Sequence, residues 1–543
     1  MIFVRCLIWH IYRLRRVVTY IISLVLSLLP CVVQAQRTDD AVMQLQKLNR
    51  VYRHLYNAYV DSVNMEQLVE GGIRAMLEEL DPHSVYLDKK EMKASQEVFE
   101  GEFSGIGVEY NVLNDTIIVV NTVVQGPAES VGVVANDRIV EIDGENVVGI
   151  ERSDVPPRLR GERGTVVKIG VRRKGVEEML NFSITRDKIP ITTVDAAYLV
   201  KDKVGYIKVN RFGRTTMSEF SEAVARLGEL DALILDLNDN GGGLLDQAVG
   251  LSGYFIPRDS LVVYTEGRAV EPRYYFAKDG GVFDGRLVVM INESSASGSE
   301  IVAGAVQDWD RGVIVGRESF GKGLVQSQIP LGDGSAMRLT VARYHTPSGR
   351  VIQRPYEMGH RDEYLKAHAD RMRSTQSDSL KRELPKFKTL MSQREVYGGG
   401  GIRPDVIVES DTTMISKYMM RVVAQGVYND FLLDYLDRNR AKLEADYPTF
   451  EKFESDFYLS DEDLQQLVER AKTKGVEYDE TGYVQSRELM RTQLSAMIAQ
   501  RLFTSSEFYR YINPRLNDIY RKAVEIVEDW SALAVPILKN PLK

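Results

Sequence analysis

The stretch from Leu287 to Gln326 holds the residues whose types could carry nucleophilic chemistry, namely a cluster of serines followed by a single lysine, Lys322. A serine hydroxyl becomes a nucleophile when a base takes its proton. A lysine can be that base only if desolvation lowers its pKa from about 10.4 and leaves the amine neutral. Phe320 before Lys322, with Leu324 and Val325 after it, permits such a buried position.

The elements expected around these residues would place them at the end of a helix. The apolar, β-branched run Leu287–Ile291 predicts a buried strand, and Asn292–Ser297 a polar turn. The Ala- and Val-rich segment Glu300–Gln307 predicts a helix, and Val313–Val315 a second strand. The serines thus lie at a strand-to-helix turn, where the first N–H groups of a helix are unpaired and can hold an oxyanion.

Two motifs in this stretch resemble the signature of a known enzyme family. The sequences SASGSE and ESFGKGLVQ are similar to those of the carboxyl-terminal processing peptidases (tail-specific proteases), which use a Ser–Lys dyad. The resemblance implies that Ser297 is the nucleophile and Lys322 the general base. It also implies that Gln326, four residues after the lysine, orients the lysine.

A second glycine-rich loop, reading NDNGGGLL, follows another predicted buried strand. The peptidases have D-L-R-x-N-P-G-G-L-L at this place, and the resemblance implies that the N–H of Gly242 or Gly243 completes an oxyanion hole with the N–H of Ser297. Asn238 replaces the family's arginine and Gly241 its proline, which leaves the rigidity of the loop open. Without the resemblance, the glycines would indicate only a tight turn.

Residues 103–187 are rich in strand-like runs, which are Val108–Tyr110, Thr116–Val123, Arg138–Ile142 and Val166–Arg172. Together with the loop FSGIGV they resemble a PDZ domain, in which free N–H groups of the loop bind the terminal carboxylate of a peptide. The matching residues are Gly105, Ile106, Gly107 and Val108. The peptide would then add as a strand to the edge of the sheet.

The repeated unit of strand, glycine loop and helix predicts an α/β fold with a parallel sheet covered by helices. The resemblance implies a crotonase- or Clp-protease-like peptidase core with an inserted β-rich PDZ domain and helical N- and C-terminal regions. The charged span 356–395 lacks periodicity and predicts a mobile insertion. The expected domains are a signal peptide (1–35), a helical region (36–100), the PDZ domain (101–188), the peptidase core (189–410) and a helical accessory domain (411–543).

The first 35 residues predict a secretory signal, because several arginines precede the apolar run Val17–Val33 and a small-residue cleavage site. We expect secretion to the cell envelope, most simply the periplasm; an uncleaved membrane anchor facing the periplasm is the alternative. Cys6 and Cys31 are the two cysteines of the 543-residue chain, so a cleaved chain would have neither disulfides nor thiol chemistry. A net charge of −8 argues against a general nucleic-acid binder.

Three other assignments of catalytic or binding residues are alternatives to the Ser–Lys dyad. His345 is the rival base, for a Ser–His–Asp triad. The sequence Gly316–Lys322 fits the G-x-x-x-x-G-K of a P-loop, but Gly323 stands where a Ser or Thr should hold magnesium, and a strand rather than a helix is expected next. Asp81 and His83 are more simply explained by a turn that ends a helix.

The sequence as a whole predicts a serine endopeptidase that cleaves proteins recognised by their free apolar C-terminus and needs no metal or organic cofactor. A catalytically silent PDZ-containing scaffold of the envelope is the alternative, although such a protein would be expected to lack the nucleophile or the base. An adaptor protein, self-association and membrane attachment through the N-terminal segment are left open.

Overall fold

The computed structural model describes residues 40–113, 115–373 and 383–539, and the predicted signal segment 1–35 lies outside these ranges. The chain divides into two compact units, residues 1–77 and 78–543. At the start of the described chain, residues 40–58 are helical and helix α2 begins at Met65 (Met65–Glu78), so both helices lie within the predicted helical region 36–100. None of the helices in the described ranges is long and apolar enough to cross a membrane.

The second unit begins with strand β1 (Val85–Leu87) and helix α3 (Lys89–Glu100). An antiparallel sheet follows, and it contains all four strands that the sequence predicts for this region. Its strands are, in spatial order, β3 (Val108–Leu113), β4 (Thr116–Thr122), β5 (Arg138–Ile142), β7 (Val166–Arg172) and β8 (Leu180–Thr185), with β6 (Glu145–Asn146) beside β5. Strands β2 (Glu102–Gly105) and β9 (Asp187–Pro190) pair separately, and the short helices are α4 (Pro127–Ser130), η1 (Arg152–Asp154) and α5 (Val155–Leu159).

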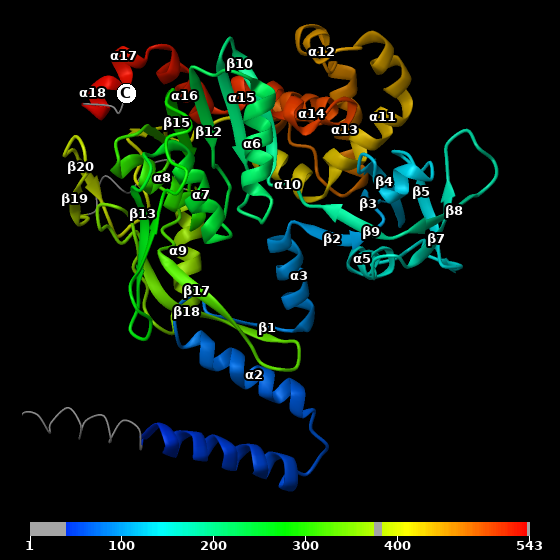
Figure 1. Ribbon diagram of the computed structural model, residues 1–543. Coiled ribbons are helices and arrows are strands. Elements are labelled where there is room, and N and C mark those ends of the chain that lie inside the picture. The colour runs from blue at the N-terminus through cyan, green and yellow to red at the C-terminus, as the bar shows by residue number, and fades with distance from the viewer. Residues whose placement is uncertain (1–39, 114, 374–382, 540–543) are drawn as a thin grey trace, which may run out of the picture. The chain divides into compact units, whose positions relative to one another are not determined.

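A six-stranded sheet forms the centre of the second unit (Figure 1). In spatial order its strands are β10 (Val194–Lys201), β11 (Val204–Val209), β12 (Ala232–Asp236), β15 (Arg286–Ile291), β16 (Val313–Gly316) and β21 (Val406–Ile407). Strand β10 is antiparallel to β11, and the remaining pairs are parallel. The predicted parallel sheet is therefore confirmed, with one antiparallel edge strand.

Helices cover both faces of this sheet because alternate residues of its buried strands point to opposite sides. Leu233 and Leu235 pack with α6 (Thr216–Leu227), α7 (Leu245–Phe255) and α8 (Gly298–Asp308). Ile234, Val288 and Met290 pack on the other side with residues of α16 (Asp518–Glu528). The carboxyl ends of β12 and β15 lead directly into the glycine-rich loop and the serine turn.

A second, antiparallel sheet lies beside the first and carries the segment after Lys322. Its strands are β1, β18 (Ala336–His345), β13 (Leu261–Glu266), β14 (Arg273–Phe276) and β17 (Leu324–Pro330), which pairs with β18. In the β17–β18 ladder Gln326 lies opposite Thr340 and Gln328 opposite Arg338. Since opposite residues of an antiparallel pair share a face, these four side chains are brought to one side of the sheet.

The charged span 356–395 is more ordered than its composition predicted. It contains helix α9 (Arg361–Arg373), strand β19 (Lys386–Lys388) and the start of β20 (Glu395–Tyr397); residues 374–382 lie outside the described ranges. Aromatic contacts of α9 explain this order. The ring centroids of His368 and Tyr364 lie 4.4 and 6.1 Å from that of Phe320. The prediction failed since these contacts are made with residues distant in the sequence.

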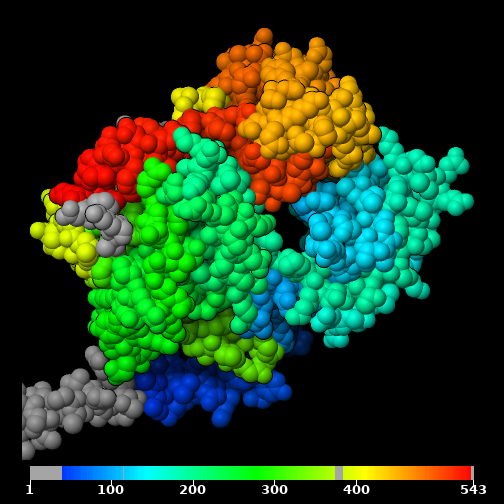
Figure 2. All heavy atoms as spheres, turned by 45° about the horizontal axis from the view of Figure 1, so that its top comes forward, coloured from blue at the N-terminus to red at the C-terminus, as the bar shows by residue number. Residues whose placement is uncertain are grey.

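The C-terminal region is helical, as predicted. Its helices are α10 (Lys417–Ala424), α11 (Val427–Asp446), α12 (Phe450–Asp456), α13 (Asp461–Thr473), α14 (Glu480–Leu502), α15 (Ser505–Leu516), α16, α17 (Trp530–Leu533) and α18 (Val535–Leu538). Ser460 forms a capping box at the start of α13. Helices α10 to α15 build a hydrophobic core of their own, whereas α16 packs on the central sheet. Figure 2 shows these orange and red helices in one continuous surface with the green region.

Candidate active site

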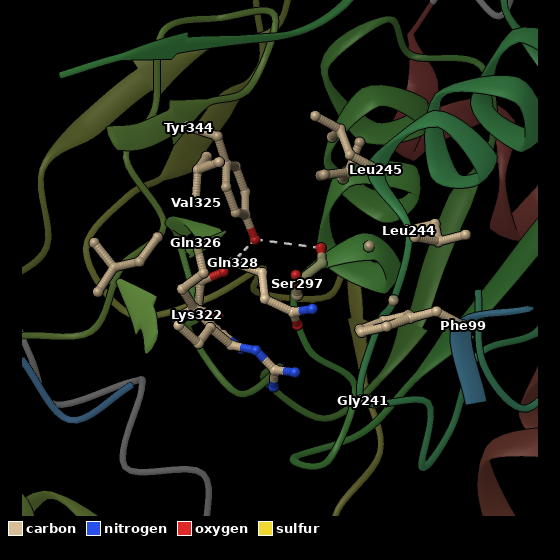
Figure 3. A pocket seen from close by; sticks show the side chains of 16 residues that line it. Phe99, Gly241, Leu244, Leu245, Ser297, Lys322, Val325, Gln326, Gln328 and Tyr344 are labelled. Carbon is tan, nitrogen blue, oxygen red and sulfur yellow. Dashed lines mark hydrogen bonds between the residues drawn. The ribbon is translucent and has the colours of Figure 1, made fainter. Parts of the chain in front are cut away.

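One cavity of about 550 Å³ collects all the residues predicted for the peptidase site (Figure 3). Ser297, Lys322, Gln326, Gly242 and Gly243 all line it. They come from four places in the chain, which are the loop after β12, the turn after β15, the loop after β16 and strand β17. The fold thus brings together in one cavity site residues that lie far apart in the sequence.

Ser297 has a backbone conformation that distinguishes it from the rest of the serine cluster. It precedes α8 with φ 54° and ψ −108°, a region that a side-chain-bearing residue enters at a cost of about 1–3 kcal/mol. Such a sharp strand-to-helix turn presents a nucleophile above the helix end. Ser297 is partly exposed and lines the cavity, whereas Ser295 and Ser299 are fully buried.

The neighbouring serines hold the turn in place. Ser295 Oγ donates to the carbonyl oxygen of Leu237 at 2.8 Å, and Ser299 Oγ donates to that of Asn240 at 2.8 Å. Both hydroxyls therefore join the serine turn to the loop after β12. Their roles in the structure differ from that of Ser297, whose side chain faces the cavity.

We expect Ser295→Ala and Ser299→Ala to cost stability rather than chemistry. Ser295→Ala removes the acceptor of the Asn292 N–H, so the free energy of unfolding should fall by about 1–3 kcal/mol. Ser299→Ala removes one hydrogen bond to the Asn240 carbonyl, which still accepts the N–H of Ala296, so the fall should be about 0.5–1.5 kcal/mol. In both variants kcat for a cleaved peptide should stay within about threefold, an effect of less than ~0.7 kcal/mol. Thermal unfolding and peptide cleavage measure the two quantities separately. A variant that loses all cleavage yet unfolds like the wild type would identify its serine as the nucleophile.

The side chain of Lys322 reaches the cavity without an ion-pair partner in the described residues. Burial lowers the pKa of Lys322, the nearby Arg338 lowers it further, and the carboxylates of Glu300 and Asp81 act in the opposite direction. The net direction is downward, which favours the neutral amine that a general base must be.

Gln326 lies in the same cavity, but it makes no hydrogen bond to Lys322. Its amide nitrogen Nε2 is buried and has no partner among the described residues. An unpaired buried amide is costly, so this group is available to a neighbouring amine or to a bound ligand. The predicted role of Gln326 in orienting Lys322 stays a prediction.

Two of the three N–H groups expected to form the oxyanion hole are already engaged. The N–H of Ser297 donates to Glu300 Oε2 at 2.8 Å, and that of Gly242 donates to Asn240 Oδ1 at 2.9 Å. The N–H of Gly243 and that of Gly298, the first residue of α8, have no acceptor in the described part of the chain. Gly298 was missed from the sequence, although its place directly after the serine at a helix start was the signal.

Gly242 lies so close to the serine turn that no side chain fits there. A Cβ atom on Gly242 would be 2.7 Å from Ser297 Cβ and 2.8 Å from the nitrogen of Gly298, and φ is +95°. Hydrogen bonds supply the rigidity that the sequence left open. Asn240 Nδ2 donates to the carbonyl of Val209, and Asn292 Nδ2 donates to Asp239 Oδ1, both at 2.9 Å.

Two buried side chains join the backbone of Ser297 to that of Lys322. Glu300 Oε2 accepts the N–H groups of both residues, at 2.8 and 2.9 Å, and Oε1 accepts Ser319 Oγ at 2.5 Å. The hydroxyl of Tyr344 lies within hydrogen-bonding distance of both carbonyl oxygens, 3.2 Å from that of Ser297 and closer to that of Lys322 (Figure 3). Neither Glu300 nor Tyr344 was singled out from the sequence.

The competing interpretations find no support in this geometry. His345 stacks on Tyr264, with ring centroids 4.5 Å apart, and does not line the cavity. Strand β17 rather than a helix follows Lys322, which rules out a P-loop. Asp81 Oδ1 accepts the N–H groups of His83 and Ser84, at 2.9 and 3.1 Å, as a turn-capping residue does. No group of three His, Cys, Asp or Glu side chains within the described ranges is placed to bind a metal ion.

Comparisons with known proteins identify several parts of the chain. The family description "Peptidase family S41" matches residues 203–357, and "PDZ domain" matches residues 104–184. Residues 29–91 match the N-terminal domain of the activating protease CtpB, and residues 418–504 match a family of unknown function (DUF8443).

Among solved structures, the photosystem II D1 C-terminal processing protease is 29% identical to this chain. The match covers 56% of this chain and 89% of that protein, with a TM-score of 0.31. The PDZ domain of a carboxy-terminal protease from Vibrio cholerae, solved in complex with a peptide, is 33% identical over 16% of this chain and 97% of its own, with a TM-score of 0.16.

Curated relatives are similar over most of their length. A carboxy-terminal-processing protease of Bartonella bacilliformis is 36% identical over 63% of this chain and 80% of its own length. The carboxy-terminal processing protease CtpB of Bacillus subtilis is 34% identical over 60% of this chain and 68% of its own. The chain therefore belongs to peptidase family S41, as a serine protease of the carboxy-terminal processing type.

Proposed function

We propose that this protease cleaves proteins that end in a free, apolar C-terminus and that Ser297 and Lys322 form its catalytic dyad. The observation that carries the proposal is that one cavity is lined both by a partly exposed serine with strained backbone and by a lysine without an ion-pair partner in the described residues. A buried lysine of this kind is an adequate base for a serine, and the rival His345 lies elsewhere.

In the proposed reaction, Ser297 Oγ attacks the carbonyl carbon of the scissile bond while Lys322 Nζ takes the hydroxyl proton. The oxyanion that forms is held by the unpaired N–H groups of Gly243 and Gly298. Lys322 then gives its proton to the leaving amine, and water hydrolyses the acyl-enzyme by the same steps in reverse. We assign Gln326 to steadying the neutral amine.

The PDZ domain supplies the proposed recognition of the C-terminus. The loop Gly105–Val108 connects β2 to β3, and the N–H groups of Ile106 and Gly107 have no acceptor among the described residues. Such N–H groups can hold a terminal carboxylate. Strand β3 is an edge strand of its sheet, so a peptide can add beside it and place apolar side chains toward the domain.

We further propose a location in the cell and a fold for the peptidase core. The N-terminal arginines and apolar run support secretion to the periplasm, or anchoring to a membrane with the enzyme facing the periplasm. The central sheet with helices on both faces supports a crotonase- or Clp-protease-like core. Adaptor binding, self-association and the gating of substrates by the C-terminal helices are further proposals.

A comparison of two tails tests the function. An unstructured protein ending in a free apolar C-terminus, and the same protein with a C-terminal amide, would be incubated with the enzyme and with Ser297→Ala. We expect cleavage by the wild type alone, with the amide lowering kcat/KM by about tenfold or more, since a lost charge-assisted hydrogen bond costs about 1.5–3 kcal/mol.

Each other outcome of this assay has a distinct meaning. Cleavage that ignores the amide would retain the protease and remove recognition of the tail by the PDZ domain. Cleavage that persists in Ser297→Ala would remove the dyad. Binding of the free-tailed protein without any cleavage would favour the silent scaffold.

A further inference from the structure

The charges around the proposed catalytic cavity are one-sided. Of the described residues, Lys322 and Arg338 line it and no carboxylate does; the amides of Gln326 and Gln328 also line it. The proposed chemistry gives Lys322 a role but none to Arg338. A cation that faces the reacting groups without an assigned partner therefore needs an explanation.

The backbone fixes Arg338 on the wall of the cavity. It lies on β18 directly opposite Gln328, and Gln326 is opposite Thr340 on the same ladder. The guanidinium donates one hydrogen bond, from Nη2 to Ser95 Oγ at 2.7 Å, and its centre lies 5.8 Å from the ring of Phe99. Both contacts come from α3, so the side chain is supported from behind by a second element.

Arg338, which is partly buried, lacks the partners that three buried arginines of the second unit have. Arg350 pairs with Asp308, Arg394 pairs with two aspartates, and Arg311 donates to three carbonyl oxygens. Arg338 makes no ion pair within the described residues, and a single neutral hydroxyl uses one of its five donors. Partial burial also lowers the pKa of Arg338, which reflects a charge deprived of water.

A guanidinium in this state has a strong preference for one kind of ligand. Its planar fork matches a carboxylate in two parallel hydrogen bonds, and such charge-assisted bonds are about twice as strong as neutral ones. The flanking amides of Gln326 and Gln328 can donate to the same group. The remaining wall of the cavity is largely apolar, with Phe99, Leu244 and Leu324 among its members. Among the described lining residues, Lys322 is the one other cation that could bind a carboxylate of the substrate.

We propose that Arg338 forms a subsite for a carboxylate of the substrate, within a few residues of the scissile bond. This inference rests on the proposed dyad, because it is the nearby Ser297 and Lys322 that define where the bond lies. The carboxylate has two chemical sources. It is the side chain of an Asp or Glu beside the cleavage site, or the free C-terminus of a tail short enough to end inside the cavity.

Three quenched fluorescent peptides of one apolar sequence separate these sources. The first carries Glu beside the scissile bond and a C-terminal amide; the second has Gln in its place and the same amide; the third has Gln and a free carboxylate two residues after the bond. Each is given to the wild type, Arg338→Gln, Arg338→Lys and Arg343→Gln. Arg343 is an exposed cation on the same strand outside the cavity and serves as the matched control.

The readout is the ratio of kcat/KM for each acidic peptide to kcat/KM for the neutral peptide. A purely structural role for Arg338, or an effect on the pKa of Lys322, changes both values together and leaves their ratio alone. We expect the wild type and Arg343→Gln to prefer one of the acidic peptides by about tenfold or more. Arg338→Gln should lower this ratio to near one, and Arg338→Lys should keep part of it.

The acidic peptide that shows the preference identifies the source of the carboxylate. A wild type without preference for either acid, or a preference that survives in Arg338→Gln, would overturn the proposal. Thermal unfolding of each variant checks folding, and Arg338→Lys retains the charge if Arg338→Gln is unstable. Cleavage of the neutral peptide, absent from Ser297→Ala, reports on the dyad in the same assay and keeps the two hypotheses apart.

Discussion

Lys322→Met is expected to lower the rate of peptide cleavage by at least ~10²–10⁴-fold, the usual contribution of a general base. Methionine has a similar length and fills the same space but cannot accept a proton. Lys322→Arg should be equally inactive, because a guanidinium is never neutral in the accessible pH range. Single-turnover cleavage of a quenched peptide measures the loss, and KM should change little.

The pH dependence of the wild type supplies the second half of this test. Only the neutral amine can take the serine proton, so kcat/KM should rise with pH as Lys322 loses its proton. Burial lowers the pKa of Lys322, and the midpoint of the rise should therefore lie below the ~10.4 of an unperturbed lysine. A midpoint at or above that value, or full turnover by Lys322→Met, would exclude Lys322 as the base.

Stability gives a control for folding, and its sign follows from the same pKa. A lysine whose pKa is lowered by folding binds its proton more weakly in the folded state, so the free energy of unfolding rises with pH between the lowered pKa and about 10.4. Lys322→Met removes this dependence. It should not reduce stability at neutral pH, and inactivity of the variant can then be assigned to chemistry.

The sequence was a good guide to the elements that carry the site, because their signals are local. The apolar β-branched runs of β12 and β15 and the small-residue helix α8 form where they were expected. The glycine loop and the serine turn meet because both follow parallel neighbours, whose carboxyl ends lie at one edge of the sheet. Topology alone therefore brings Gly242 to Ser297.

The groups that complete the site were missed for two different reasons. Glu300 stands three residues after Ser297 in the pattern S-x-x-E, which is the signature of a capping box. The sequence could therefore have predicted its hydrogen bond with the Ser297 N–H. Tyr344 and Arg338 reach the cavity from β18 through strand pairing with β17. Nothing near them in the sequence indicates this contact, because it is decided by long-range register.

The bridge of hydrogen bonds that joins the backbone of Ser297 to that of Lys322, the proposed dyad, has its own consequence for catalysis. Glu300 is fully buried, and its two oxygens accept four hydrogen bonds, from the N–H groups of Ser297, Lys322 and Gly321 and from Ser319 Oγ. Burial raises the pKa of Glu300, and the four hydrogen bonds act in the opposite direction. Because all four neighbours donate, the ionised carboxylate is the form that the geometry favours. Through this one group the turn that holds the serine and the loop that holds the lysine are kept in register.

Glu300→Gln is therefore expected to impair catalysis well beyond its effect on substrate binding. The NH₂ of the glutamine amide cannot accept a hydrogen bond, yet it must face donors that the carboxylate accepted. This mismatch should lower the free energy of unfolding by about 1–3 kcal/mol. A small displacement of serine from lysine should lower kcat by about 10²-fold with KM little changed. Glu300 also raises the pKa of Lys322, so the variant's rise of kcat/KM with pH should move to lower pH.

Two further variants separate these effects. Tyr344→Phe removes the hydroxyl from the carbonyl side of the same bridge without changing a charge, so kcat should fall while the pH midpoint stays in place. Asp308→Asn alters another fully buried carboxylate of α8, one that binds Arg350 and the N–H of Ser348 away from the cavity. It should lower stability as Glu300→Gln does and yet leave kcat and the pH midpoint unchanged. If Asp308→Asn and Glu300→Gln lose kcat equally, or Glu300→Gln moves no midpoint, the bridge is packing alone and does not position the dyad.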